Sequence, residues 1–490
     1  MAVQKIGEQK MTSTTIQVGI FVFITALIAF LTYIKCRSAV KSTDHSIQAE
    51  NKEVFLAGGS LSWFFVAGSI TLTNLSTDQL VGMNGNQMAL VAWWEFAAVI
   101  GLIVLAKVFL PVYYKYECTT TTELLEKRYG DKHIRAVISV LFLLGNIGIF
   151  IPAMLYGGSL FMQSMFGLDV SIIVLATTFA LAGAAYAVFG GLRAVAVSDA
   201  YSGVLLLSLG MVVVYLSLSA IDFDFSGIPA ERLTLIGDSA SAIPWHTLLT
   251  GMLFIQIFYW STNQTITQRA MASPTLKEGQ KGVYAAALIR LLIVPAMIVI
   301  PGIVSYKLYG KLGDSAYGQI VGDVLPVWLS GAFAAAVAAA VLTSVNSILN
   351  ASTALYVCDI HEKYSSSPPN VKKLNVIITL TIVAIALILV PFYQRADSII
   401  ETVQQLYGLL SMPILSAFMV CLLFDRVDSR AAILAVVFGV AFYAILFFNA
   451  PIHYIHSMFV TLVSCVIMSL SLSKFVFKTQ PTWVGRVSAA

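Results

Sequence analysis

Charged residues are scarce in this sequence. Asp, Glu, Lys and Arg make up 11% of its 490 residues, whereas a soluble globular protein has about 25%. Hydrophobic residues make up 58%. A soluble protein of this length needs far more polar surface to cover its core, so the composition excludes a chain of soluble domains. It also excludes a disordered chain, which would be poor in apolar residues. A membrane protein with many spans remains.

Cysteine and histidine are also rare, with five and six residues. The cysteines show neither a metal-ligand spacing nor a disulfide framework, so we expect them to pack as small apolar side chains. No predicted span places a histidine beside a serine or an aspartate in a catalytic motif, which argues against an enzyme. The 29 Lys and Arg residues, for a net charge of +4, form no dense basic face. This argues against a nucleic-acid partner.

Long apolar stretches dominate what is present. A membrane-spanning helix needs roughly 20 mostly apolar residues. Thirteen stretches of about this length predict an all-α membrane protein, and we read the first as a retained helix because no small-residue cleavage site follows it. They lie near residues 15–35, 61–84, 89–114, 134–164, 170–189, 196–219, 245–271, 282–308, 321–358, 374–394, 398–424, 430–449 and 452–473.

The basic residues orient these spans. With the N-terminus outside, 21 of the 29 Lys and Arg residues fall in inside loops, Arg269 among them, and six fall outside. Lys107 and Arg290 lie within spans. Such a bias fits the positive-inside rule and an odd number of spans. We therefore expect a multi-pass protein of the plasma (inner) membrane, with its N-terminus outside and its C-terminus in the cytoplasm.

Two spans contain polar stretches at membrane depth. Residues 71–79 read TLTNLSTDQ, and residues 256–264 read QIFYWSTNQ. Hydroxyl and amide side chains compete with helical backbone bonds, and irregular backbone in a membrane is tolerated only inside protein or beside a wet cavity. Paired interrupted helices are a sequence sign of a transporter binding site. The two breaks lie five helices apart, which predicts a second repeat inverted with respect to the first.

A third span is built from small and hydroxyl residues. Residues 331–340 read GAFAAAVAAA, which allows close backbone approach. Ala340, Thr343, Ser344 and Ser347 follow on one helical face. Hydroxyls and free carbonyls suit a weakly held hard cation. Hydroxyls that bond back to their own helix explain the pattern equally well.

Charged residues within spans mark further candidates. Glu95 and Arg290 lie inside spans, and Asp199 opens another. Arg290 cannot lose its charge and lies too deep to reach water easily, so it needs an acceptor. We expect Glu95 and Arg290 to line a polar cavity, with Glu95 or a bound substrate as the acceptor. An ion pair between helices is the alternative.

Taken together, these segments resemble the sodium/solute symporter family, most closely its bacterial sodium/galactose and sodium/glucose cotransporters. The resemblance covers about residues 50 to 450. It implies the leucine-transporter fold of five plus five inverted helices, with one helix before the repeats and two after. The segments that carry it are 55–63 (FLAGGSLSW), 74–79 (NLSTDQ), 190–195 (GGLRAV) with Asp199, 259–264 (YWSTNQ), Gln268–Arg269 and 338–350 (AAAVLTSVNSILN).

The resemblance also implies binding residues. Carried over position by position, the sodium ligands are Leu72, Leu75, Ala340, Thr343 and Ser344. Some relatives have a second sodium site or exit path, whose positions here are Asp199, Ser347 and Asn346; the asparagine replaces a serine and puts that second site in doubt. The implied substrate-binding set is Asn74, Ser76, Gln79, Trp94, Glu95, Gln256, Tyr259, Trp260, Asn263, Arg290 and Gln404.

The substrate set departs from the galactose transporters at three positions. Gln256 replaces an asparagine, Arg290 a lysine and Phe150 another asparagine. Amides, a carboxylate and an aromatic ring suit a neutral sugar. Because arginine favours carboxylate and sulfonate groups, a sugar acid, a sulfonated sugar or sialic acid is the alternative. We expect a monomeric symporter of a hexose-like sugar coupled to Na⁺; a sugar sensor that does not transport is a further alternative.

The expected organisation follows from these assignments. It comprises an outside tail 1–14, a leading helix 15–36, a cytoplasmic linker 37–60, a first repeat 61–220, an external loop 221–244, a second repeat 245–425, two C-terminal helices 426–473 and a cytoplasmic tail 474–490.

Overall fold

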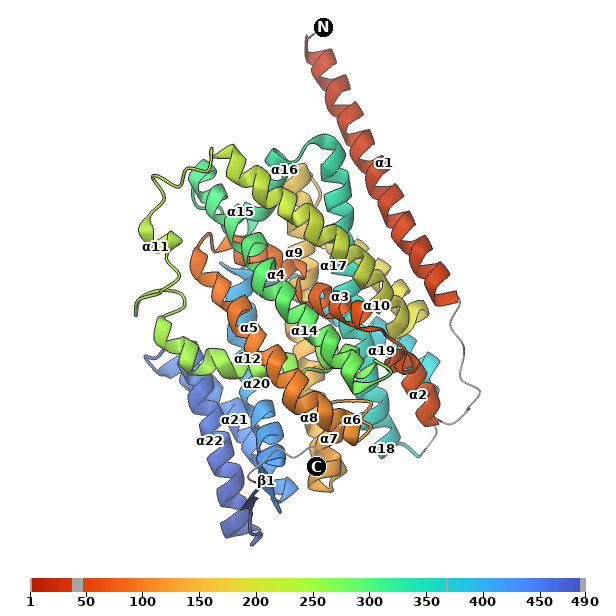
Figure 1. The fold of residues 1–490 in the computed structure, drawn as a ribbon, viewed down its shortest axis with the longest axis vertical. Helices are drawn as coiled ribbons and strands as arrows, with labels where there is room; N and C mark the ends of the chain where they lie inside the picture. Colours follow the sequence, from red (N-terminus) through yellow and green to blue (C-terminus); the bar gives the residue numbers. More distant parts are fainter. Residues whose placement is uncertain (1, 38–46, 367–368, 485–490) are drawn as a thin grey trace.

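The computed structural model describes residues 2–37, 47–366 and 369–484 as a bundle of helices (Figure 1). Residues 38–46 of the expected linker and 485–490 of the expected tail lie outside the described residues. The described part contains ten helices long and apolar enough to cross a membrane. The shorter apolar segments Ile172–Ala185 and Gly251–Ser261, and the broken helix described below, account for the remaining predicted spans.

The elements of the first half follow in chain order. They are α1 (Ala2–Arg37), α2 (Ile47–Phe55), η1 (Ala57–Gly59), α3 (Trp63–Asn74), α4 (Thr77–Gly85), η2 (Ala89–Ala92), α5 (Trp93–Val104), η3 (Leu105–Phe109), α6 (Leu110–Lys115), α7 (Glu123–Tyr129), α8 (Lys132–Gly145), η4 (Asn146–Phe150), α9 (Ile151–Phe166), α10 (Ile172–Ala220) and α11 (Ala230–Leu233).

The second half continues from η5 to the C-terminal strand. It contains η5 (Trp245–Leu249), α12 (Gly251–Ser261), α13 (Gln264–Met271), α14 (Leu276–Leu292), α15 (Val294–Tyr309), η6 (Gly313–Ser315), α16 (Ala316–Val324), α17 (Val327–Ala354), η7 (Leu355–His361), α18 (Glu362–Tyr364), α19 (Val371–Tyr393), α20 (Ile399–Leu423), β1 (Phe424–Asp425), α21 (Ser429–Asn449), α22 (Tyr454–Ser471), η8 (Leu472–Val476) and β2 (Thr482–Trp483). The two strands pair antiparallel, with Phe424 opposite Trp483.

The helix break predicted within 71–79 is present between α3 and α4. Leu75 and Ser76 have non-helical ψ angles of 56° and 173°. Leu75 is fully buried, so this irregular backbone lies inside protein, as membrane depth requires. The second predicted break separates α12 from α13 at Thr262 and Asn263. The Asn263 side chain begins α13 by accepting a hydrogen bond from the Thr265 N–H at 2.9 Å.

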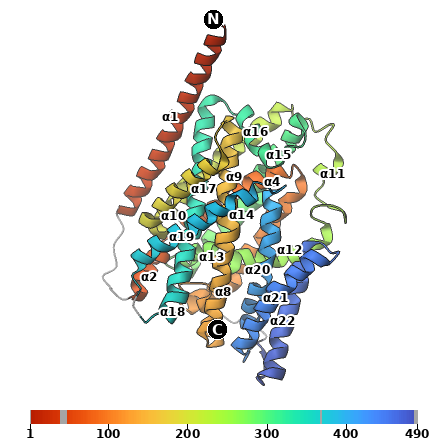
Figure 2. The same ribbon diagram turned by 180° about the vertical axis from the view of Figure 1, so that it is seen from behind.

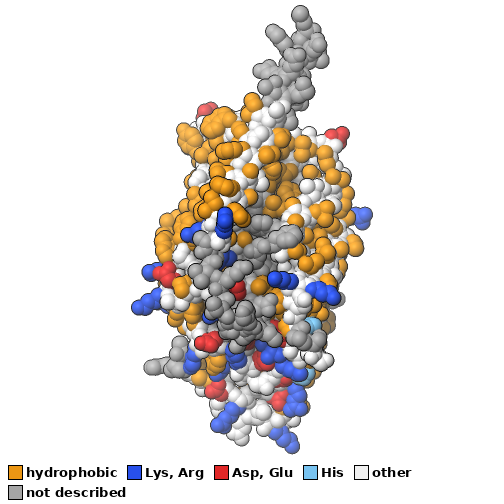
Figure 3. Space-filling model, turned by 90° about the vertical axis from the view of Figure 1, so that its right-hand side faces the viewer, with side chains coloured by type: hydrophobic (Ala, Val, Ile, Leu, Met, Phe, Trp, Pro, Cys, Tyr) orange, Lys and Arg blue, Asp and Glu red, His pale blue; other side chains and the backbone are white. Residues whose placement is uncertain are grey.

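Helix α17 is the buried centre of the bundle. It packs against α10, α1 and α9, and its alanine-rich first half allows that close packing. Views from the front and the back both place α1 along the outside of the bundle (Figure 2). Figure 3 shows apolar side chains over much of the surface and many Lys and Arg side chains toward the lower end.

Three predicted boundaries differ from the structure. Helix α10 runs from Ile172 to Ala220 without the loop expected between 189 and 196; its 49 residues correspond to about 74 Å of helix, longer than one bilayer is thick. Helix α1 begins at Ala2 rather than near residue 15. The span expected from residue 321 begins at Val327, because Leu325 and Pro326 separate it from α16.

Asp314 in η6 joins the end of α4 to the start of α20. Its Oδ2 accepts a hydrogen bond from the Ile399 N–H at 2.8 Å, and its Oδ1 is buried without a partner. Gly85 lies so close that a Cβ there would overlap Asp314. Burial raises the pKa of Asp314 from 3.8 to about 7. The folded chain therefore favours the protonated carboxyl group.

We expect Asp314→Asn to increase the stability of the folded chain more at pH 8 than at pH 4. Below about pH 4 the carboxyl group is protonated in both states, and between pH 4 and 7 the unfolded chain ionises first, so wild-type stability falls over that window. The raised pKa corresponds to a loss of wild-type folding stability of up to about 4 kcal/mol above pH 7. Thermal unfolding midpoints at both pH values measure it. The exposed Asp397→Asn is the control, and an equal effect of Asp314→Asn at both pH values would contradict the assignment.

Candidate functional site

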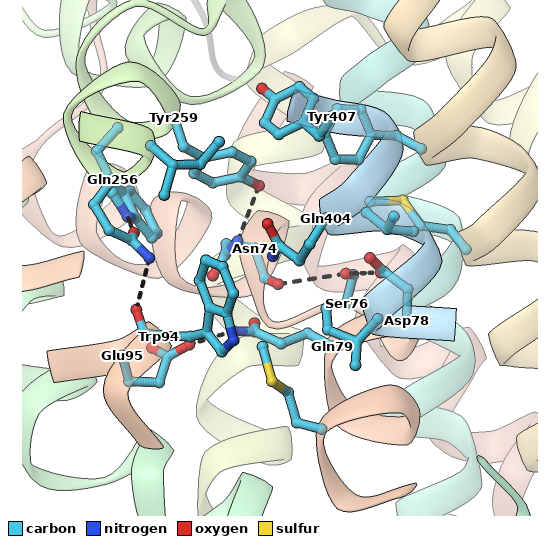
Figure 4. Close-up of a pocket in the computed structure, with 17 residues that line it drawn as sticks. Asn74, Ser76, Asp78, Gln79, Trp94, Glu95, Gln256, Tyr259, Gln404 and Tyr407 are labelled. Carbon is cyan, nitrogen blue, oxygen red and sulfur yellow. Dashed lines mark hydrogen bonds between the residues drawn. The ribbon is translucent and has the colours of Figure 1, made fainter. Parts of the chain in front are cut away.

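A cavity of about 60 Å³ lies beside the α3–α4 break, walled by α4, α5, α9, α12 and α20 (Figure 4). Polar side chains from both broken helices face aromatic rings across it. Nine of the eleven substrate-binding candidates line this cavity, and Arg290 and Asn263 do not. The lining residues are Asn74, Ser76, Asp78, Gln79, Met83, Trp94, Glu95, Phe150, Met154, Ile255, Gln256, Tyr259, Trp260, Ile400, Val403, Gln404 and Tyr407.

Amide groups supply hydrogen-bonding atoms to the cavity. Asn74 Nδ2 donates to the Tyr259 hydroxyl at 2.9 Å, and Asn74 Oδ1 has no partner. Gln79 Nε2 donates to Glu95, and Gln79 Oε1 also has no partner. Buried acceptors without partners carry a desolvation cost that a ligand hydroxyl would relieve. The cavity is therefore suited to a solute that donates hydrogen bonds.

Gln256 has a structural role in the cavity wall. Its Nε2 donates to the Trp94 carbonyl at 3.0 Å, and its Oε1 accepts from Trp260 Nε1 at 2.8 Å. Gly101 of α5 meets the Gln256 carbonyl so closely that a side chain there would collide with it. Gln256 thus holds α12 against the start of α5 and fixes the Trp260 indole.

Aromatic rings close one side of the cavity. Phe150 meets Tyr407 edge to face, with ring centroids 4.7 Å apart. Tyr259 lies 6.1 Å from Tyr407 and 5.2 Å from Trp260. Such rings offer a flat apolar surface with a polar edge. Asn263 lies behind them, where its Nδ2 donates to the Tyr407 hydroxyl at 3.1 Å.

Arg290 is paired with Glu95 rather than open to the cavity. Its Nη1 donates to Glu95 Oε2, and both side chains are almost completely buried. The guanidinium carbon lies 4.5 Å from the centre of a Trp260 ring, and Nη2 reaches the Thr71 carbonyl at 3.4 Å. The structure thus shows the ion pair between helices. Among the described lining residues, none is Lys or Arg.

Two polar residues of the cavity were missed from the sequence. Asp78 lies in the first turn of α4 and accepts a hydrogen bond from Ser76 Oγ, and its position in the polar segment 71–79 was the available signal. Tyr407 contributes a ring from α20, and nothing in its own apolar span marks it. The cavity wall therefore carries two carboxylates, Asp78 and Glu95, and one of them is balanced by Arg290.

The sodium-ligand candidates meet where α3 breaks beside α17. Ser344 Oγ lies 3.5 Å from the Leu72 carbonyl oxygen and 3.4 Å from that of Thr73. Thr343 Oγ1 donates to the Ala339 carbonyl at 2.8 Å and lies 3.4 Å from that of Ala340. Leu75 and Ala340 are fully buried beside them in the same elements. Oxygen atoms from both elements thus converge here, and the Asp199 carboxylate lies nearby, with its Oδ2 3.4 Å from Thr73 Oγ1.

A second polar cluster surrounds Asp199. Its Oδ2 accepts from Ser69 Oγ at 2.5 Å, and Arg269 Nη2 lies 4.0 Å from it. Arg269 Nη2 also donates to Ser347 Oγ. Arg269 was counted in an inside loop, but it lies in α13 and is fully buried. The Asn346 amide is buried with neither its nitrogen nor its oxygen partnered.

Comparison with known proteins identifies the fold and the family. The sodium:solute symporter family model matches residues 54–439. The chain is 33% identical over 454 residues to an uncharacterized symporter of Escherichia coli, YidK, covering 88% of this chain and 78% of that one. It is 30% identical over 433 residues to a sodium/glucose cotransporter of Vibrio parahaemolyticus, covering 81% and 79%.

A solved structure shows the same architecture. A substrate-bound, outward-open Na⁺-coupled sialic acid symporter matches with a TM-score of 0.79 at 18% identity, over 94% of this chain and 97% of that one. At this identity the match shows the fold, which is the leucine-transporter fold with its two broken helices. The chain therefore belongs to the sodium:solute symporter family, as a sodium-coupled transporter and not an enzyme.

Proposed function

We propose that this symporter carries a neutral polyhydroxylated solute, a hexose-like sugar, together with sodium. The observation that carries the proposal is the pairing of Arg290 with Glu95, which removes the one candidate cation from the cavity. An acidic or sulfonated sugar would face Asp78 and Glu95 without a free positive partner. The unpartnered oxygens of Asn74 and Gln79 and the ring of Tyr259 suit hydroxyl groups and a sugar face. The similarity to a sodium/glucose cotransporter supports the same substrate class.

Sodium would bind where α3 breaks. In the proposed site, the carbonyls of Leu72, Leu75 and Ala340 and the hydroxyls of Thr343 and Ser344 hold the ion. The closeness of Ser344 to the Leu72 carbonyl supports this assignment. Sodium would then tie α3 to α17 and fix Asn74, which is two residues beyond Leu72, in the cavity wall. Sodium and solute would each strengthen binding of the other.

The second cluster would serve as the sodium exit path. Asp199 Oδ1 and the Asn346 amide are buried without partners, so they offer polar atoms to a passing ion. Ser347 is already bonded to Arg269 and to the Thr343 carbonyl. The orientation that we propose has the N-terminus outside and the C-terminus in the cytoplasm, for a monomer in the inner membrane. The gathering of Lys and Arg toward one end supports it (Figure 3).

Uptake into proteoliposomes tests the proposed substrate. We expect an inward sodium gradient to drive uptake of a hexose or inositol, and choline in place of sodium to abolish it. Sialic acid and a sulfonated sugar are the acidic arms of the same panel. Sodium-driven uptake of an acidic arm alone would overturn the neutral-sugar proposal while leaving the sodium site intact.

Two variants of Tyr259 distinguish the contribution of its ring to solute binding from that of its hydroxyl. Tyr259→Phe removes only the hydrogen bond from Asn74, so we expect a rise in KM of about fivefold, the value of one hydrogen bond near 1 kcal/mol. Tyr259→Ala also removes the ring, and we expect uptake to fall at least tenfold further. The control is Tyr309→Phe, whose hydroxyl donates to the Asp323 carboxylate at 2.6 Å, because neither residue lines the cavity. Equal effects of Phe and Ala would contradict a stacking role.

A further inference from the structure

A second cavity lies on the lipid side of α20. It has a volume of about 580 Å³ and lies between the end of α19, the first half of α20 and the last turns of α21. Its walls are mostly apolar, with Leu406 and Leu409 on one side and Phe447 and Phe448 on the other. These helices are long and apolar enough to cross a membrane, so the cavity opens toward acyl chains. Phe392 and Phe448, at its rim, are 57% and 79% exposed.

The mouth of this cavity is polar. Arg395, in the connection between α19 and α20, lines it and is exposed. Among the described residues, no carboxylate lies within ion-pair distance of Arg395. Gln405 also lines the cavity, and its Nε2 holds the Glu401 carboxylate at 2.9 Å. Asp397 is exposed in the same connection. Around the mouth lie a guanidinium without an ion pair among the described residues and the carboxylates of Asp397 and Glu401, at the ends of two helices of membrane-spanning length.

We propose that this cavity binds one phospholipid with a zwitterionic primary-amine headgroup, a phosphatidylethanolamine. Its phosphate would meet Arg395, since guanidinium groups bind phosphate through two parallel hydrogen bonds. Its ammonium would meet Glu401, and one acyl chain would lie along the leucines and phenylalanines. An anionic headgroup without an amine would leave the carboxylates of Asp397 and Glu401 opposed to it.

Lipid binding would affect the solute cavity, because the single helix α20 separates the two cavities. Helix α20 turns Thr402, Gln405 and Leu406 toward the lipid cavity and Val403 and Gln404 toward the solute cavity. A lipid packed behind α20 therefore supports the wall that carries Gln404. This site is independent of the identity of the transported solute and goes beyond the proposed function.

Lipid retention in native mass spectrometry tests the site. The whole chain is exposed to equal amounts of phosphatidylethanolamine, phosphatidylcholine and phosphatidylglycerol, and we expect one phosphatidylethanolamine to be retained preferentially. Arg395→Gln should lower that retention roughly fivefold, as for loss of one basic residue at a lipid surface. Ala444→Phe should lower it further by placing a ring where the acyl chain would lie. Lys311→Gln, at an exposed lysine outside the cavity, is the matched control.

Hydrogen exchange provides the second measurement. Amides of residues 399–410 should exchange more slowly in phosphatidylethanolamine nanodiscs than in phosphatidylcholine nanodiscs, and this difference should vanish in Arg395→Gln. Equal retention of the three lipids, or retention unchanged in both cavity variants, would overturn the proposal and show surface lipid only. Preference for phosphatidylglycerol would overturn the zwitterionic assignment.

Discussion

Sodium will cease to stabilise the chain when Thr343 and Ser344 are both replaced by alanine. An ion that binds only the folded state raises stability by about 2.7 kcal/mol at a hundredfold excess over its Kd. Both hydroxyls lie on α17, that of Ser344 beside the Leu72 carbonyl of the α3 break and that of Thr343 beside the Ala340 carbonyl, so the double variant removes two of the five proposed ligands. We expect the unfolding midpoint of the wild type to rise in sodium chloride relative to choline chloride, and that of the double variant to stay unchanged.

Thr353→Ala is the matched control for this experiment. Thr353 lies on the same helix and its hydroxyl bonds back to the Leu349 carbonyl at 3.0 Å, so the control removes a similar group away from the break. It should keep the sodium-dependent rise, whatever its own stability. The measurement needs no transported solute, so it tests the ion site separately from the substrate. A sodium-dependent rise retained in the double variant would reject the site.

The second large effect is expected at the buried pair of Arg290 and Glu95. Arg290→Met leaves the Glu95 carboxylate buried without its ion partner, and Glu95→Gln leaves the guanidinium in the same state. Breaking a buried pair from one side costs about 3–5 kcal/mol. The double variant removes both charges, so we expect it to be more stable than either single variant. Unfolding of the four proteins in detergent gives the coupling energy directly.

An exposed pair supplies the comparison. Lys281 lies 3.0 Å from Glu278, and its side chain is 64% exposed. Lys281→Met should cost less than about 1 kcal/mol, because water replaces the lost partner. If the two single changes at the buried pair added up in the double variant, the charges would not depend on each other. That result would indicate that Arg290 is available to a ligand in the cavity, and an acidic substrate would again be a candidate.

The two helix breaks could be predicted from the residue types around them. The breaks after Asn74 and before Gln264 follow from hydroxyl and amide residues in otherwise apolar spans, and both are present. The continuous helix across Gly190 could not be predicted in this way, because glycine pairs favour interruption and only tertiary packing decides otherwise. The start of α17 depends on Pro326, which stands in the sequence but was read as part of a span.

The sequence predicted most of the polar residues that line the cavity, but it did not predict which charged side chains pair with each other. Asn74, Gln79 and Tyr259 stand out as polar groups in membrane helices, and all three line the cavity. The partner of Arg290 was open, because Glu95 lies 195 residues away and no local pattern links them. Arg269 was misplaced for a related reason: its position near a predicted span end resembles that of a loop residue, and only packing against Asp199 reveals its burial.

The contact between Ser344 and the Leu72 carbonyl also constrains how the chain is made. The two residues are 272 positions apart, so ribosomes deliver the α3 break to the membrane long before α17 exists. Until then the open carbonyls at Leu72 and Thr73 lack their hydroxyl partner and depend on water or on the insertion machinery. The break is therefore one of the parts of the first repeat that mature only after α17 is made; another is Arg135, whose partner Asp359 comes later still. Chains that stop before residue 344 should remain bound to membrane quality control rather than accumulate as stable half-transporters.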